Sequence, residues 1–159
     1  MRADGHEAPG RVVLLHSNDL HSRLEQYAKM SSLIEAERTR YGPDRVLVLD
    51  AGDHMDRMRK ETEGTGGRVN IELLNAAAVD AVTLGNNEGL SWTMESLDEL
   101  YGSHARFPVL CANMVRESDG GRPSWMKTSV LVKKGGITFG ITGATAAFHE
   151  FYRELGWRM

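Results

Sequence analysis

Three short segments of the chain carry side chains able to bind a metal ion, and each follows an apolar run typical of a β-strand. The segments are Asn18–His21, Gly52–Asp53 and Gly85–Glu88. A parallel sheet gathers the carboxyl ends of its strands on one edge, and open α/β sheets bind ligands there. Carboxylate, imidazole and amide groups meeting at that edge predict a metal centre suited to phosphate chemistry.

The spacing within these segments favours a shared site. Asp19 and His21 are two residues apart, so in an extended segment both side chains face the same side. Asp53 follows Gly52, whose missing side chain permits a sharp turn after a strand. Asn86 follows a glycine in the same way. Each pattern alone is common in ordinary surface turns, but their order after three successive strands indicates one ligand cluster.

Length and composition indicate one globular domain. The chain has 159 residues, of which 41% are hydrophobic, and its net charge of −3 gives no reason to expect a nucleic-acid polymer as partner. Residues 1–10 are polar and lack the apolar segment of a secretory signal, and no apolar run approaches membrane-spanning length. We therefore expect a flexible tail at 1–10, one domain at 11–159, a cytoplasmic location and no membrane contact.

Strand and helix patterns alternate along the first two-thirds of the chain. Strands are predicted at 11–17, 46–49, 81–84 and 109–112, helices at 22–41, 69–77 and 94–101, and a long polar loop at 54–67. Right-handed crossovers turn this βαβαβαβ order into a layered parallel sheet. The last third predicts an antiparallel hairpin, with strands at 129–133 and 137–142 around Gly135 and Gly136. The single cysteine, Cys111, is predicted to be a small buried strand residue.

The first helix has the clearest boundaries. Ser22 is predicted to cap it, with Glu25 completing a capping box, and Gly42 and Pro43 end it. Its apolar face is predicted to hold Leu24, Tyr27, Met30, Ile34 and Ala36.

Several segments together resemble a known family. The motifs at 15–21, 50–53 and 80–86 are similar to those of the 5′-nucleotidase branch of the calcineurin-like metallophosphoesterases, and the likeness extends to 111–114 and 136–143. It covers the chain from Val12 to Thr145 in the family's order. The resemblance implies an α/β fold, the first half of a four-layer αββα sandwich, which is the amino-terminal part of the catalytic domain.

The resemblance also implies a mechanism and a ligand set. The family uses two divalent metal ions to activate a water that attacks a phosphate ester, here a nucleotide or another small phosphate ester. By this likeness Asp19 and His21 bind the first ion, Asp53 bridges both ions, and Asn86 binds the second ion close to the substrate phosphate. Mn²⁺, Mg²⁺, Zn²⁺ or a similar ion suits these donors. Asp50 either orients a ligand or makes a structural hydrogen bond in its turn.

The chain departs from the family pattern where the family has its catalytic pair. The family has Gly-Asn-His-Glu followed by an aspartate, whereas this chain has Asn87 for the histidine and Leu90 for the aspartate. Asn87 can bind a phosphoryl oxygen beside Asn86, but it cannot transfer a proton. Proton transfer by a positioned side chain raises the reaction rate about 10²–10⁴-fold in many enzymes.

The proton donor is therefore unknown from the sequence. His54, next to Asp53, is one hypothetical substitute, and a loop or supporting histidine is the preferred interpretation of it. His16 is predicted to pack within the first strand.

The Gly-His-x-His motif that the family supplies from the second half of its catalytic domain is missing from this chain. We therefore expect the chain to be inactive alone, without that half and without the family's carboxy-terminal recognition domain. Two alternatives to nucleotide monoester hydrolysis stay open. One is a cyclic-nucleotide phosphodiesterase or nucleotide-sugar pyrophosphatase; the other is a non-catalytic metal- or nucleotide-binding module.

Overall fold

The structure, a computed structural model, describes residues 11–159, and the tail predicted at 1–10 lies outside them. At its centre is a five-stranded sheet of order β1-β2-β3-β4-β6, in which all neighbours are parallel. The strands are β1 (Val13–Ser17), β2 (Val46–Asp50), β3 (Ala81–Thr83), β4 (Val109–Leu110) and β6 (Met126–Lys127). The first four confirm the predicted α/β order. Strand β6 was not predicted, because its two residues lie in no longer apolar run like the one at 109–112 that indicated β4.

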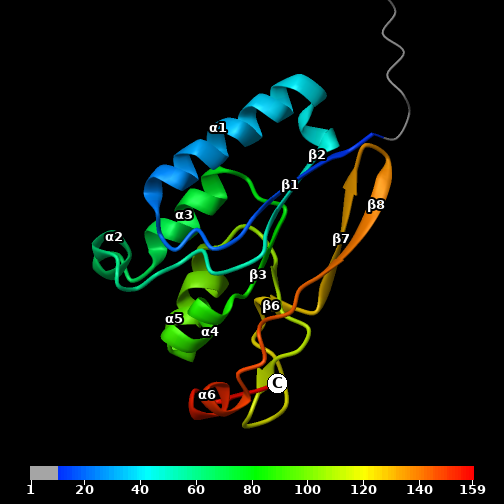
Figure 1. Cartoon of the computed structure of the whole chain (residues 1–159). Helices are drawn as coiled ribbons and strands as arrows, with labels where there is room; N and C mark the ends of the chain where they lie inside the picture. Colours follow the sequence, from blue (N-terminus) through cyan, green and yellow to red (C-terminus); the bar gives the residue numbers. More distant parts are fainter. Residues whose placement is uncertain (1–10) are drawn as a thin grey trace, which may run out of the picture.

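Five helices connect the first four strands along one face of the sheet: α1 (Leu24–Tyr41), α2 (Lys60–Gly64), α3 (Arg68–Ala76), α4 (Asn86–Ser91) and α5 (Met94–Glu99). A 3₁₀ turn lies at Pro43–Arg45 and a π-helical turn at Leu100–His104, and α6 (His149–Glu154) follows near the end of the chain. Strands β1 to β4 lie in chain order, so right-handed crossovers place their connecting helices on the same side. Figure 1 shows α1 beside α3 on that side. The prediction of a loop at 54–67 is wrong in part, since this segment contains α2.

Helix α1 follows its predicted apolar face but not its predicted start. Tyr27 and Ile34 are buried in the core as expected, whereas Ala36 is exposed. The helix ends before Gly42, whose φ of 87° is a conformation that glycine adopts without strain. The predicted capping box is wrong. Arg23 holds the cap position without a side-chain hydrogen bond, and the Ser22 hydroxyl bonds to the Thr62 hydroxyl instead of to the helix.

The other face of β1 is open. Leu14 is 56% exposed, and His16 shares this face and is exposed too, because alternate residues of a strand point the same way. The prediction that His16 is packed is therefore wrong, since only one face of this strand is covered. The partly buried Val13 and Leu15 lie on the covered face and contact the core.

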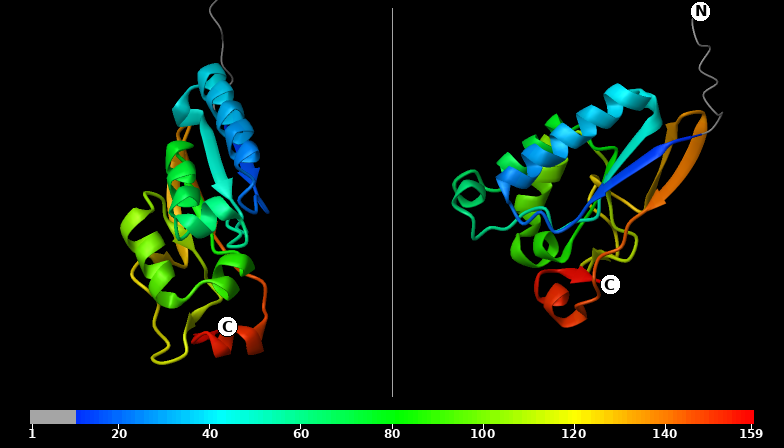
Figure 2. Two further views of the ribbon diagram at one scale, coloured as in Figure 1. Left: turned by 90° about the vertical axis from the view of Figure 1, so that its left-hand side faces the viewer. Right: turned by 45° about the horizontal axis from the view of Figure 1, so that its top comes forward.

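The predicted hairpin is confirmed. Strands β7 (Ser129–Lys134) and β8 (Ile137–Thr142) pair antiparallel around the Gly135–Gly136 turn, and Figure 2 shows the hairpin extending from the sheet. A small antiparallel pair, β5 (Val115–Arg116) with β9 (Trp157–Arg158), lies near the end of the chain. Among the described helices, none has both the length and the apolar character needed to cross a bilayer.

Candidate metal centre

The turn after β1 has an unusual backbone. Asp19, His21 and Ser22 have φ values of 54°, 45° and 54°, a region that residues other than glycine rarely adopt and that costs of order 1–3 kcal/mol at each position. The prediction of an extended segment here is therefore wrong. The turn after β2 holds this turn in place, because the Asp19 and His21 amides donate to the carbonyls of Gly52 and Asp53 at 3.1 and 3.0 Å.

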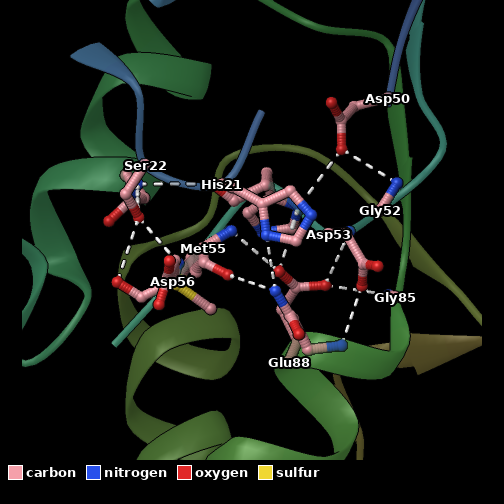
Figure 3. Close-up of polar contacts among 12 residues, drawn as sticks. His21, Ser22, Asp50, Gly52, Asp53, Met55, Asp56, Gly85 and Glu88 are labelled. Atoms are coloured by element: carbon pink, nitrogen blue, oxygen red, sulfur yellow. Dashed lines mark hydrogen bonds and ion pairs between the residues drawn. The ribbon is translucent and has the colours of Figure 1, made fainter. Parts of the chain in front are cut away.

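Three of the predicted ligands meet at this edge of the sheet. One donor atom from each of Asp19, His21 and Asp53 lies within 4.8 Å of the other two. His21 Nε2 is 3.4 Å from Asp19 Oδ1, and Figure 3 shows His21 beside Asp53. Two carboxylates and an imidazole are donors that divalent transition metals accept, so the residues present fit such an ion.

The fourth predicted ligand lies next to this cluster. With its amide nitrogen turned to Asp53, Asn86 reaches Asp53 Oδ2 at 3.3 Å. Asn86, Asp19 and Asp53 line a polar cavity of about 240 Å³.

The cavity has a second wall at residues 144–146. This segment follows β8 and is held by two hydrogen bonds between Asn113 and the Thr145 backbone. No local pattern in the sequence predicts this second wall.

Two glycines let the turns after β2 and β3 approach. A side chain on Gly52 would come within 2.6 Å of the Gly85 Cα, and one on Gly85 would collide with the Asp53 backbone nitrogen. Because only hydrogen fits between the two backbones, both positions require glycine. This close approach brings Asn86 next to Asp53.

Glu88 links the same two turns from inside. Its side chain is fully buried and accepts backbone N–H groups from Gly85 (2.9 Å), Asp53 (3.0 Å) and Met55 (2.8 Å) (Figure 3). Burial raises the pKa of this carboxyl group. Glu88 ends the third predicted ligand segment, but its supporting role was not predicted, although its place three residues after the helix-capping Gly85 is a recognisable capping pattern.

His54 faces the interior and not the cavity. It is fully buried, with Nδ1 3.1 Å from Asp50 Oδ1 and Nε2 2.9 Å from the Tyr101 hydroxyl. Burial opposes its charge, but the carboxylates of Glu88 and Asp50 raise the pKa of His54 to about 9. Both ring nitrogens have internal partners, so the geometry favours a supporting histidine over a proton donor.

Asp50 shows the second of its two predicted roles. Its Oδ1 accepts from the Gly52 amide at 3.1 Å and its Oδ2 from the Ser17 hydroxyl at 2.7 Å, which are hydrogen bonds of the turn. The same Oδ1 lies 3.1 Å from Nδ1 of His54, the residue that follows Asp53.

Asn87 contacts two of the three clustered residues. Its backbone amide donates to Asp53 Oδ1 at 2.8 Å, and its side-chain nitrogen lies 2.7 Å from His21 Nδ1. The Asn87 nitrogen can only donate, so His21 Nδ1 accepts this hydrogen bond, which fixes the orientation of the ring. The contacts therefore give Asn87 a supporting position toward His21.

Comparisons with curated proteins extend over nearly the whole chain. It is 40% identical over 150 residues to the metallophosphoesterase YunD of Bacillus subtilis (strain 168), covering 92% of this chain and 32% of that protein. It is 34% identical over 164 residues to the human 5′-nucleotidase, covering 91% of this chain and 28% of the relative. The chain thus spans about a third of the length of these relatives.

Solved structures show the same fold. The NAD nucleotidase NadN of Haemophilus influenzae superposes with a TM-score of 0.74 at 24% identity, covering 86% of this chain and 26% of that one. The 5′-nucleotidase precursor of Thermus thermophilus superposes with a TM-score of 0.67 at 22% identity, covering 85% and 28%. The family model for calcineurin-like phosphoesterases matches residues 12–156. This match takes in β1, β2, β3 and the turns that hold the ligand cluster, and the chain belongs to the calcineurin-like phosphoesterase family.

Proposed function

We propose that the chain forms part of a metal-dependent phosphoric ester hydrolase of the 5′-nucleotidase type, acting on nucleotides or similar small phosphate esters. The observation that carries the proposal is the cluster of Asp19, His21 and Asp53, with one donor atom of each within 4.8 Å of the others. The names of the human and Thermus relatives support a nucleotide substrate.

Each residue of the site has its own part in this proposal. Asp19, His21 and Asp53 would hold one ion, and Asn86 would contribute with Asp53 to a second. Divalent ions, when bound, stabilise charge on phosphoryl oxygens and lower the pKa of water. Asn86 lines the cavity of about 240 Å³, where its amide can orient a phosphate group. Four ligands are few for two ions, so we propose that turnover needs donors from a further part of the protein.

A second candidate function is a metal- or nucleotide-binding module without catalysis. Asn87 carries an amide where the family has an imidazole, and His54 is enclosed by Asp50 and Tyr101. Neither position therefore offers a proton to a leaving group. The lack of a proton donor at these two positions is the observation that favours binding over hydrolysis.

A phosphate-release assay with Mn²⁺ tests the proposal on the whole protein and on the 159-residue chain. The panel holds nucleoside monophosphates, cyclic nucleotides and nucleotide sugars. Phosphate release from monophosphates by the whole protein supports the proposal. Formation of a nucleoside monophosphate from cyclic nucleotides or nucleotide sugars, followed by chromatography and without phosphate release, indicates a phosphodiesterase or pyrophosphatase. Mn²⁺ binding without any of these products indicates the binding module.

The matched variants are Asp53→Asn and Asp44→Asn. Asp53→Asn removes a charge from the cluster and is expected to lower Mn²⁺ affinity and abolish release. Asp44 is exposed in the 3₁₀ turn before β2, and its replacement is expected to leave both unchanged. Equal activity of the two variants would refute the assignment of Asp53.

A further inference from the structure

A closed ring of buried polar side chains lies behind the His21 turn. Its members are Ser22, which is 3% exposed, and the fully buried Thr62 of α2 and Asn70 of α3. Ser22 Oγ lies 2.7 Å from Thr62 Oγ1, Thr62 Oγ1 lies 3.0 Å from Asn70 Oδ1, and Asn70 Nδ2 lies 3.0 Å from Ser22 Oγ. We call these three residues the Ser22 ring.

The proton positions in the ring follow from the groups themselves. The Asn70 oxygen can only accept, so the single hydroxyl proton of Thr62 goes to it. Ser22 then donates its own proton to Thr62, and the Asn70 nitrogen donates to Ser22. Each donor and acceptor in the circuit is used once. A complete circuit of this kind makes a buried polar group stable, whereas a broken one leaves an unpaired group behind.

The ring is tied to both turns of the metal centre. Ser22 directly follows His21, and its amide donates to the His54 carbonyl at 3.0 Å. Its hydroxyl also accepts the Asp56 amide at 2.7 Å, a contact drawn in Figure 3. A single side chain therefore holds the segment after His21 against the segment after Asp53.

The ring also explains a strained backbone. Ser22 has a φ of 54°, and so have Asp19 and Asp53 at the two sides of the cluster. Such a conformation persists only where the surroundings fix it. The hydroxyl of Ser22 is the only part of its side chain that can do so, since Cβ itself is what disfavours this conformation.

We propose that Ser22 is a positioning residue of the metal centre, and that the Ser22 ring sets the affinity for metal by holding His21 and Asp53 at the spacing of one ion. This inference rests on the proposed metal centre but not on hydrolysis. Partners that orient metal ligands from outside typically change metal affinity by about 10–100-fold when removed.

Mn²⁺ affinity, measured by titration calorimetry at a temperature where each variant is folded, tests the proposal. Ser22→Ala is expected to weaken Mn²⁺ binding by about 10–100-fold. Ser32→Ala is the matched control, because Ser32 loses an exposed hydroxyl bonded to the Ala28 carbonyl in α1, away from the site. It should bind Mn²⁺ as the unaltered protein does.

A second pair of variants keeps the test valid if Ser22→Ala does not fold. Thr62→Val preserves the shape of Thr62 and removes its hydroxyl, so it opens the ring without touching a ligand turn, and it should weaken Mn²⁺ binding several-fold. Thr62→Ser keeps the hydroxyl and should restore the affinity. Hydrogen exchange gives a readout without metal: the Asp56 amide should exchange faster in Thr62→Val than in Thr62→Ser.

The outcomes separate this inference from the proposed function. Folded Ser22→Ala or Thr62→Val protein that binds Mn²⁺ normally overturns the inference, as does an equal loss in Ser32→Ala. An unaltered protein that binds no Mn²⁺ overturns it together with the metal centre. If Mn²⁺ binding depends on the ring but the protein releases no phosphate, the result supports this inference and refutes the proposed hydrolase function.

Discussion

Two regions of the molecule are stabilised in different ways. One is the edge of the sheet formed by the turns after β1, β2 and β3; the other is the hairpin β7–β8. Within residues 11–159, six of the seven buried polar or charged residues belong to that edge or directly support it: Ser22, Asp50, His54, Thr62, Asn70 and Glu88. The hairpin instead follows regular antiparallel pairing from Ser129 to Thr142. It leaves large apolar side chains in solvent, with Leu131 75% exposed.

The difference shows where each region is vulnerable. A buried polar group stabilises a protein only while every partner is present, and it is costly once one is lost. The edge should therefore respond strongly to substitutions that remove a single acceptor. The hairpin depends on backbone pairing, so its exposed side chains should tolerate replacement.

Glu88→Ala should have the largest effect on stability. It leaves three backbone N–H groups, those of Gly85, Asp53 and Met55, without their acceptor and removes the carboxylate near His54. We expect a loss of about 3–5 kcal/mol in the free energy of unfolding, measured by urea denaturation. The control is Glu95→Ala, an exposed residue of α5, with a change within about 0.5 kcal/mol. Similar losses in both would contradict the role of Glu88.

His54→Gln should cost about 3 kcal/mol, because it leaves Asp50 and Glu88 without the cationic partner between them. The exposed His16 provides the control, and His16→Gln should change the unfolding free energy by less than about 0.5 kcal/mol. Turnover per folded molecule separates the two interpretations of His54. Turnover lost while folding and Mn²⁺ binding stay intact would restore the proton-donor hypothesis.

Gly85→Ala should cost about 2–3 kcal/mol, since the added methyl group meets the Asp53 backbone, which cannot move without disturbing the cluster. Mn²⁺ affinity should fall with it. Gly64→Ala is the matched change: Gly64 ends α2 and has open space around it, so alanine should be neutral or stabilising by up to about 1 kcal/mol. Thermal unfolding of the two variants measures the contrast, and an equal shift would disprove the close-packing argument.

Leu131→Thr should have the smallest effect, within about 0.5 kcal/mol, because this side chain is mostly in solvent already and threonine suits a strand. Urea denaturation checks this value. A loss above about 2 kcal/mol would mean that the hairpin depends on side-chain burial as the edge does, and the contrast between the two regions would fail.

Much of the fold could be predicted from local patterns. The alternation of strands and helices, the buried Tyr27 and Ile34 of α1 and the glycine turn of the hairpin all follow from periodicity or turn chemistry, which are written in neighbouring residues. The placement of Asp19, His21 and Asp53 after two successive strands also followed, because parallel strands end on one edge. The second sheet of the four-layer sandwich stays a prediction.

The parts that could not be predicted depend on contacts between distant residues. Ser22 has the sequence context of a helix cap, yet its bonds to Thr62 and Asn70 hold it in a conformation that local preferences disfavour. His16 has the context of a packed residue, but the chain order of the strands leaves its face of the sheet open.

The sequence by itself determined which donor groups are available and in what order they arrive at the sheet edge. Tertiary structure decided that the donor atoms of Asp19, His21 and Asp53 come within 4.8 Å of one another. The physical reason is that their turns have left-handed backbone conformations, which local preferences disfavour. Contacts between separate elements compensate for that strain: the backbone bonds from Asp19 and His21 to the turn after β2, and the buried contacts of Glu88 and Ser22.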